Sequence, residues 1–437
     1  MRDHYRLFTW GLSYFSAKIR AYMRYKAFHG ALKFEEILAT QDLMMNYIVP
    51  ATGAAVVPQV QTPKDDWLQD SSEIIDALES IHPEAPVVPS TPRQRLVSYL
   101  IELLADEWML PWGFWERWHY SLKDVAPNHE AFNAQQWGPI FNADGTGLER
   151  REAARFVFKE MMRIDNPAEA VVGPYSGLVQ LGVTEKTEAA WTTSIRNMLS
   201  LLETHFDTHD FVLGGRPTLG DFALMGPLYA HLYRDPVPGF MMRTEFPLVC
   251  EWIERTNGSD ESGIRSYKQS SYKFENGELV GQPAATNNGE LLADDQIPDS
   301  LLPFISVFFD EMWPALKLNA KTVTDYLAGP DVDKVAPLPG KSFYAPPEFS
   351  ELQSKGGALN YEFEIGGVTE CKMASPYQIW MLQRLNSAMS GAFQDEEQKT
   401  RLTDFLTGFN DGTALLNLDQ LLKGCRVRKQ FEQIYAD

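Results

Sequence analysis

The sequence FVLGGRPTLGDF, residues 211–222, predicts a sharply defined helix start. Two glycines and a proline form a loop, and Thr218 follows them as the predicted N-cap. Asp221 lies three residues later, where a carboxylate accepts hydrogen bonds from backbone N–H groups that the first helical turn leaves without partners. We therefore expect a helix from Thr218 to about Tyr233.

Around this stretch, apolar residues recur at helical spacing through most of residues 93–255. A polar stretch rich in Gly and Ser, from Thr256 to about Ser300, is typical of a linker or a long surface loop. Beyond it, the hydrophobic pattern again predicts helices, interrupted by one β-hairpin with Gly366-Gly367 at its turn. The predicted helices are residues 96–110, 149–163, 185–205, 218–233, 301–318, 376–393, 396–409 and 414–435, and the hairpin strands are 361–365 and 368–372.

The first 90 residues have a different pattern, in which short strands and helices alternate. Asp70 is a predicted cap with Glu73 three residues on, which places the start of the second helix. The order is typical of a compact α/β unit. The predicted strands are residues 7–10, 32–35, 56–60 and 67–69, and the helices are 16–28 and 74–81.

Composition restricts the class of protein. The chain has 437 residues, of which 44% are hydrophobic and 22% charged, and its formal net charge is -20. This balance disfavours nucleic acid and anionic membrane surfaces as partners, since both attract clustered Lys and Arg. The three cysteines are widely spaced, and neither a signal peptide nor a run of about 18 apolar residues is evident, so we expect a cytoplasmic protein with reduced thiols.

Three short signals in the α/β unit suggest chemistry. The first is LSYFSAKIR, residues 12–20, at the end of the first strand and the start of the first helix. The second is Val57-Pro58, and the third is Asp70-Ser71 at a helix start. Each also has a plain structural interpretation, because Ser13, Ser16 and Asp70 are ordinary helix-capping residues.

Together, these motifs and residues 211–222 resemble the glutathione S-transferase family over about Tyr5 to Arg255. The resemblance implies a thioredoxin-like glutathione-binding α/β domain (1–87) and an all-α domain of the glutathione-transferase type (93–258). A mainly α C-terminal extension with one β-hairpin (259–437) follows, and its role is unknown. The family usually has Ala where this chain has Gly220.

The resemblance also implies roles for the motifs. Ser13, with Ser16 as the alternative, would hydrogen-bond the glutathione sulfur at the N-terminus of a helix. Val57, held before a cis Pro58, would contact the glutathione backbone. Asp70 would face the ammonium of the γ-glutamyl group, and Ser71 would bind its carboxylate.

A hydrophobic substrate pocket is predicted between the two domains, lined by aromatic rings from both. The tryptophans of residues 108–118 recur at spacings of four, three and three, so they can share one helical face, although Pro111 predicts a kink. The alternative is a tryptophan-rich core or domain interface. The candidate pocket residues are Tyr14, Phe15, Trp108, Trp112 and Trp115.

The expected function is glutathione-dependent transfer to a small hydrophobic electrophile, with glutathione as co-substrate and no metal. His205 and His209 are expected at the surface rather than on a metal, since no acidic third ligand accompanies them. A homodimer is the usual family assembly, which the extension could prevent. The alternatives are a non-catalytic binding or scaffold protein on the same fold, and a transferase that uses another thiol.

Overall fold

A four-stranded mixed sheet with the order β2-β1-β3-β4 forms the N-terminal domain. The computed structural model describes residues 2–121, 123–161, 180–258, 272–281, 289–330, 335–338, 359–431 and 433–437. β1 pairs with β2 in parallel, while β3 is antiparallel to both β1 and β4. The elements are β1 (Tyr5–Thr9), α1 (Tyr14–Phe28), β2 (Phe34–Leu38), α2 (Gln41–Leu43), η1 (Met44–Ile48), α3 (Val49–Thr52), β3 (Gln59–Gln61), β4 (Trp67–Gln69) and α4 (Ser71–Ile81).

Helices form the second domain, as the hydrophobic spacing predicts. The predicted kink lies between η2 and α6, where Met109 separates two helical segments and Pro111 is the second residue of the latter. The elements are α5 (Pro92–Leu103), η2 (Leu104–Trp108), α6 (Leu110–Tyr120), α7 (His129–Phe141), α8 (Gly147–Phe156), η3 (Val157–Met161), α10 (Glu188–Phe206), α11 (Leu219–Met225), η5 (Gly226–Tyr233), α12 (Pro236–Glu245) and α13 (Pro247–Asn257).

The start of α11 has the predicted geometry. Asp221 is fully buried, and its carboxylate accepts from the backbone N–H of Thr218 at 2.8 Å and of Val212 at 3.0 Å. Gly220 has a packing reason, because a Cβ at this position would lie 3.2 Å from the Cβ of Ile101. This close contact explains why glycine, and not alanine, occupies the position.

The extension contains more strands than predicted. The predicted hairpin is confirmed as β7 and β8, which pair in antiparallel register from Ile365–Val368 outward. A second pair, β5 and β6, lies within the segment predicted as a linker; residues 259–271 and 282–288 of that segment lie outside the described part of the chain. The elements are β5 (Tyr272–Glu275), β6 (Glu278–Gly281), η7 (Ala293–Asp295), η8 (Asp299–Leu301), α15 (Leu302–Val307), η9 (Phe308–Met312), α16 (Trp313–Leu327), β7 (Asn360–Ile365), β8 (Val368–Met373), α18 (Pro376–Gln394), α19 (Glu396–Leu406), η11 (Gly412–Asn417), α20 (Leu418–Leu421), β9 (Val427–Gln430) and β10 (Gln433–Ala436).

The helix predicted for residues 414–435 is confirmed only as far as Leu421, and the rest of the prediction is wrong. Helical structure ends at Leu421, and Gly424 adopts a φ of 94°, which only glycine enters readily. β9 and β10 then pair in antiparallel fashion. The apolar residues of this segment lie on two short strands. The prediction fails because a short apolar run is compatible with either a strand or a helix.

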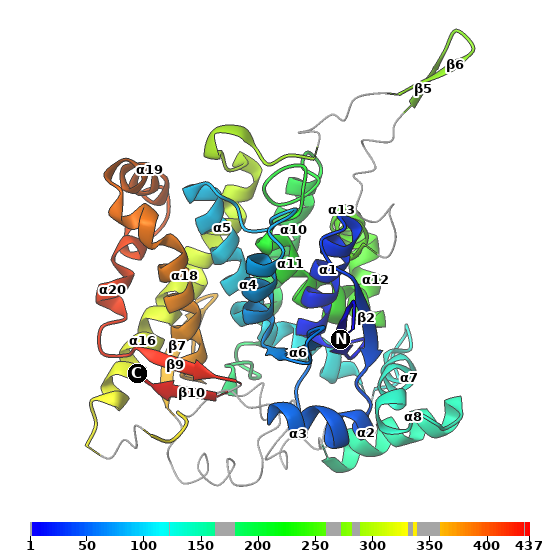
Figure 1. Ribbon diagram of the computed structural model, residues 1–437. Helices are drawn as coiled ribbons and strands as arrows, with labels where there is room; N and C mark the ends of the chain where they lie inside the picture. The colour runs from blue at the N-terminus through cyan, green and yellow to red at the C-terminus, as the bar shows by residue number, and fades with distance from the viewer. Residues whose placement is uncertain are drawn as a thin grey trace.

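From η7 onward, the extension packs on the first two domains, whereas the β5–β6 hairpin projects away from them (Figure 1). Figure 1 shows α16, α18, α19 and α20 gathered on one side of the molecule, with α18 beside α5. One continuous apolar core includes Tyr22 of the sheet domain, Trp108 of the helical domain, and Trp313 and Leu385 of the extension. The three parts are therefore one packed unit.

Candidate functional site

The predicted ligand-binding motifs meet at one end of the sheet. Phe8, near the C-terminal end of β1, pairs with Gln59 at the start of β3, and Gln59 pairs with Gln69 at the end of β4. The chain therefore leaves β1, enters β3 and leaves β4 at the same end. The segments at that end carry Ser13, Val57–Pro58 and Asp70–Ser71.

Ser13 is the N-cap of α1. Its Oγ accepts from the backbone N–H of Ser16 at 3.3 Å, and the residue is half-buried. A serine hydroxyl that accepts one bond retains its hydrogen for donation to another group. Ser16 is fully buried. Of the two serines, Ser13 is therefore the one that a ligand can reach.

The peptide bond between Val57 and Pro58 is cis, as predicted. Val57 is half-buried and Pro58 is buried. The strand begins at Gln59, later than the sequence pattern suggests, since proline has no N–H for a ladder bond.

Asp70 is the N-cap of α4 and has a φ of 66°, an uncommon value for a residue other than glycine. Its Oδ1 accepts from the backbone N–H of Ser72 at 2.9 Å and of Glu73 at 3.3 Å. Ser71 is 5% exposed. Backbone strain of this kind is often retained at functional sites.

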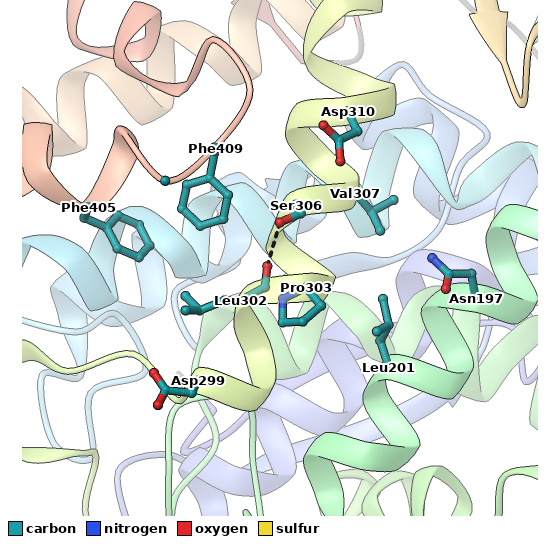
Figure 2. Close-up of a pocket in the computed structure, with 11 residues that line it drawn as sticks. Asn197, Leu201, Asp299, Leu302, Pro303, Ser306, Val307, Asp310, Phe405 and Phe409 are labelled. Atoms are coloured by element: carbon teal, nitrogen blue, oxygen red, sulfur yellow. Dashed lines mark hydrogen bonds between the residues drawn. The ribbon is translucent and has the colours of Figure 1, made fainter.

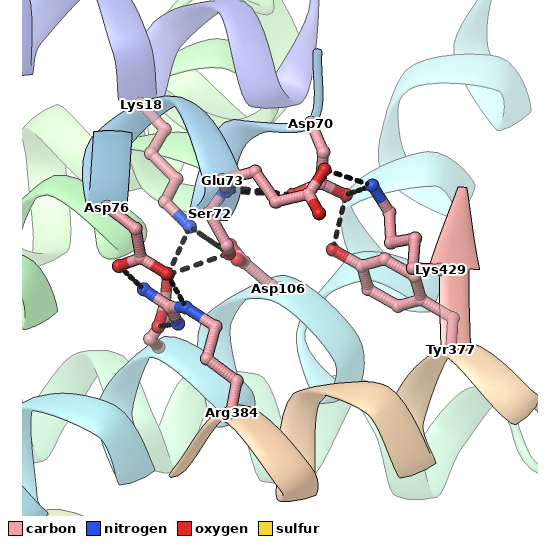
Figure 3. Close-up of polar contacts among 10 residues, drawn as sticks. Lys18, Asp70, Ser72, Glu73, Asp76, Asp106, Tyr377, Arg384 and Lys429 are labelled. Carbon is pink, nitrogen blue, oxygen red and sulfur yellow. Dashed lines mark hydrogen bonds and ion pairs between the residues drawn. The ribbon is translucent and has the colours of Figure 1, made fainter. Parts of the chain in front are cut away.

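Two side chains of the extension contact Asp70, as Figure 3 shows. The Tyr377 hydroxyl of α18 donates to Asp70 Oδ2 at 2.8 Å. Lys429 Nζ of β9 lies 3.6 Å from the same oxygen and 2.6 Å from Glu73 Oε2. No sequence motif marks these residues, and more than 300 positions separate them from Asp70.

A buried ionic network lies beside this turn and joins all three parts of the chain (Figure 3). Lys18 Nζ of α1 lies 2.8 Å from Glu102 Oε1 and 2.6 Å from Asp106 Oδ2, with all three side chains buried. Arg384 of α18 pairs with the same Glu102 and, at 2.5 Å, with Asp76 of α4. Lys18 is thus a structural cation, not a residue that a ligand can reach.

The network has opposite effects on its two buried carboxyls. Burial alone would raise the pKa of Glu102, but Arg384 and Lys18 outweigh it and lower the pKa to about 2. Burial raises the pKa of Asp106 to about 7, against the attraction of Lys18 and with the help of the Glu102 charge. Glu102 is therefore the carboxylate that depends on the extension's arginine.

Comparisons with known proteins agree with this architecture. Residues 7–86 match the family model of the glutathione S-transferase N-terminal domain, and residues 170–260 match that of the glutathione S-transferase C-terminal domain. The chain belongs to the glutathione S-transferase family. A search of curated proteins finds no match.

Several solved structures are similar to this family member. A glutathione S-transferase from Rhodospirillum rubrum F11 is 15% identical, covering 59% of this chain and 90% of its own, with a TM-score of 0.35. A β-etherase from Sphingobium sp. strain SYK-6 is 16% identical, covering 60% and 98%, with a TM-score of 0.39. A glutathione transferase family member from Pseudomonas fluorescens Pf-5, with bound glutathione, is 15% identical, covering 60% and 97%, with a TM-score of 0.31.

In this glutathione S-transferase family member, most of the rings predicted to line a pocket are core residues. Tyr14, Trp108 and Trp112 are each at most 3% exposed. Tyr14 donates its hydroxyl to the Ala105 carbonyl, and Trp108 Nε1 donates to Glu311 of the extension at 2.9 Å. The burial of Trp108 and Trp112 favours the alternative, a tryptophan-rich core, over an open pocket wall at these positions.

The four tryptophans also do not share one face. Trp112 and Trp115 stack with ring centroids 4.4 Å apart, whereas Trp118 belongs to a separate apolar cluster. The break at Met109 turns Trp108 toward the extension instead. Phe15 and Trp115 are half-buried and remain candidates for contact with a hydrophobic substrate.

A cavity of about 650 Å³ lies elsewhere in this family member, between α10 and the extension (Figure 2). It contains no residue of the sheet domain and none of the predicted site residues. Its walls are mainly apolar, with two carboxylates. They comprise Asn197, Leu201, Asp299, Leu302, Pro303, Ser306, Val307, Asp310, Phe405, Gly408 and Phe409.

The histidine prediction needs a correction. His205 is buried, not at the surface, because it lies on the inner face of α10 with Nδ1 2.9 Å from the Ser300 hydroxyl. Burial lowers its pKa to about 3. Among the described residues, no group of three His, Cys, Asp or Glu side chains could hold a metal ion. Within the same part of the chain, no helix has the length and apolarity to cross a membrane.

Proposed function

We propose that this chain is a glutathione-dependent transferase in which the glutathione thiolate attacks a small hydrophobic electrophile. The observation that supports the proposal is the convergence of Ser13, the cis Val57–Pro58 peptide and Asp70–Ser71 at one end of the sheet. One tripeptide bound across this end would have its sulfur at Ser13, its backbone at Val57 and its γ-glutamyl group at Asp70 and Ser71.

In the proposed reaction, Ser13 and the start of α1 stabilise the thiolate. The Ser13 hydroxyl donates to the sulfur, and the N-terminal dipole of a 15-residue helix adds partial positive charge. The thiol proton leaves to solvent, the sulfur lone pair forms a bond to the electrophilic carbon, and the leaving group departs with its electron pair. Phe15 and Trp115, both half-buried, would contact the electrophile between the domains.

A serine at the turn favours conjugation, ether cleavage or isomerisation over thiol–disulfide reduction. Reduction through a mixed disulfide needs a cysteine at this position, and a serine forms no such bond. Cys250 lies in α13, Cys371 in β8, and Cys425 between α20 and β9, all away from this turn in the sequence. Widely spaced free thiols are also consistent with a cytoplasmic protein.

A second candidate function, a non-catalytic binding or scaffold protein on this fold, is favoured by one observation. Tyr377 and Lys429 already contact Asp70, the residue expected to face the ligand ammonium. A transferase for a different thiol would be consistent with the same contacts. Glutathione binding separates the transferase for another thiol from the proposed function, and turnover of an electrophile separates the non-catalytic protein from it.

The test is calorimetric titration with glutathione of the wild type and of Ser71→Ala and Ser13→Ala. We expect saturable binding that Ser71→Ala weakens about tenfold or more, since a hydrogen bond to a charged carboxylate is lost. Ser13→Ala should leave affinity nearly unchanged but lower turnover of a model electrophile about tenfold to hundredfold. Absence of binding at millimolar glutathione would remove the transferase proposal.

Trp115→Ala tests the electrophile site separately. Loss of the half-buried indole should weaken binding of a hydrophobic ligand about tenfold, because an aromatic contact of this size is lost. Glutathione affinity should change less than about twofold. Fluorescence titration with a hydrophobic dye beside glutathione calorimetry measures both, and equal loss of the two affinities would contradict the assignment.

A further inference from the structure

The Asp70 carboxylate already accepts three hydrogen bonds from the chain itself and lies within ion-pair distance of one lysine. A carboxylate has about four lone-pair positions. Oδ1 faces the backbone N–H groups of Ser72 and Glu73, and Oδ2 faces the Tyr377 hydroxyl and Lys429 Nζ. The Asp70 side chain is only 7% exposed. Because the carboxylate is nearly buried under these groups, a ligand ammonium can reach it only where one of them moves away.

We infer that Lys429 occupies the subsite for the glutathione ammonium, so that the C-terminal strand β9 competes with glutathione for Asp70. The inference rests on the proposed function, because the ammonium subsite is part of it. Lys429 brings to Asp70 the same group, a primary ammonium, that the γ-glutamyl end of glutathione carries. The other three donors are neutral, so Lys429 is the donor that an incoming ammonium replaces without a change of charge.

The strand that carries Lys429 is held in a defined register. The Gln383 side chain of α18 donates to the Val427 carbonyl and accepts from the Val427 N–H, both at 2.8 Å. The Lys429 ammonium lies 5.1 Å from the Trp380 ring centroid, and the side chain is 1% exposed. An intramolecular group placed in this way has a high effective concentration at its site.

Displacement of Lys429 leaves the charge around the Asp70 carboxylate unchanged. A buried carboxylate that loses its cation is strongly destabilised, but here a ligand ammonium takes the place of the lysine ammonium. The second partner of Lys429, Glu73, has a side chain that is 41% exposed, so water can solvate it after the exchange. The competition between Lys429 and the ligand ammonium would set the glutathione concentration at which the site fills.

The experiment compares two ligands on the wild type and on Lys429→Met, which keeps most of the stem and removes the charge. The ligands are glutathione and its glutaryl analogue, which retains the carboxylate but has no amino group. Lys423→Met is the control, because Lys423 is an exposed lysine of the same C-terminal segment. Lys429→Gln is a second variant, and circular dichroism verifies the folding of each protein.

We expect Lys429→Met and Lys429→Gln to bind glutathione at least about tenfold more tightly than the wild type. Affinity for the glutaryl analogue should change less than about threefold, and Lys423→Met should match the wild type. In the wild type alone, the two ligands should have dissociation constants within about threefold of each other, since the contact that the ligand ammonium gains is offset by the Lys429 contact that is lost.

Three results would overturn the inference. If the wild type binds glutathione and removal of the Lys429 charge leaves affinity equal or weaker, Lys429 does not compete, and the proposed function stands. If affinity for both ligands rises equally, the gain does not come from the ammonium subsite. If neither the wild type nor the variants bind glutathione, the inference and the proposed function fail together.

Discussion

Replacement of Arg384 by Met should lower the free energy of unfolding by about 3–5 kcal/mol, since it removes one partner of a buried ion pair. The Arg384 side chain is 8% exposed, and it pairs with Glu102, whose side chain is fully buried. Glu102 would retain Lys18, but that ammonium also serves Asp106. Urea denaturation followed by circular dichroism measures the change.

Two further variants separate the ion pair from loss of side-chain volume. Arg384→Met combined with Glu102→Gln should recover part of the lost stability, because the buried charge is removed together with its partner. Arg401→Met should cost less than about 1 kcal/mol, since its pair with Glu397 is exposed. Equal losses for Arg384→Met and Arg401→Met would show that the extension does not depend on this contact.

Some features of the fold and of the candidate site are predictable from the sequence, whereas the Arg384 contact is not. The turn at Ser13 and the cap at Asp70 were predictable because local chemistry determines them: a hydroxyl before a helix and a carboxylate at a helix start. The capping residue Asp221 follows the same logic. Short-range geometry of this kind is encoded within a few residues. The cis bond before β3 followed from the family resemblance instead, since most X-Pro bonds are trans.

The contacts of the extension could not be predicted in this way. Tyr377 lies 307 positions from Asp70. No local sequence pattern predicts which carboxylate a distant tyrosine or lysine will contact. The hydrophobic pattern predicts a helix at Lys429, but this residue lies on a strand that begins after Gly424. The tryptophans illustrate the same limit, because helical spacing places Trp108 on a face but does not state what covers that face. Here Glu311 of the extension accepts its N–H bond.

Asp221→Ala should cost about 3–5 kcal/mol of unfolding free energy, because the carboxylate has four donors and is itself fully buried. Besides the N–H groups of Val212 and Thr218, the Thr218 hydroxyl and Trp252 Nε1 donate to it, each at 3.0 Å. Alanine would leave these groups buried without an acceptor, and the loop of residues 211–217 would lose its attachment to α11 and α13. Urea denaturation again gives the magnitude.

The chain contains a matched control for this prediction in the capping box at the start of α8. Glu149 accepts from the Thr146 N–H at 2.7 Å, as Asp221 does from Thr218, but this box is exposed. Glu149→Ala should therefore have a much smaller effect, since water replaces the lost acceptor. A second variant, Trp252→Phe, removes one donor and keeps most of the ring; in the Asp221→Ala background it should cost less than in the wild type. Additive losses for the pair would mean that Asp221 stabilises the domain by some route other than these hydrogen bonds.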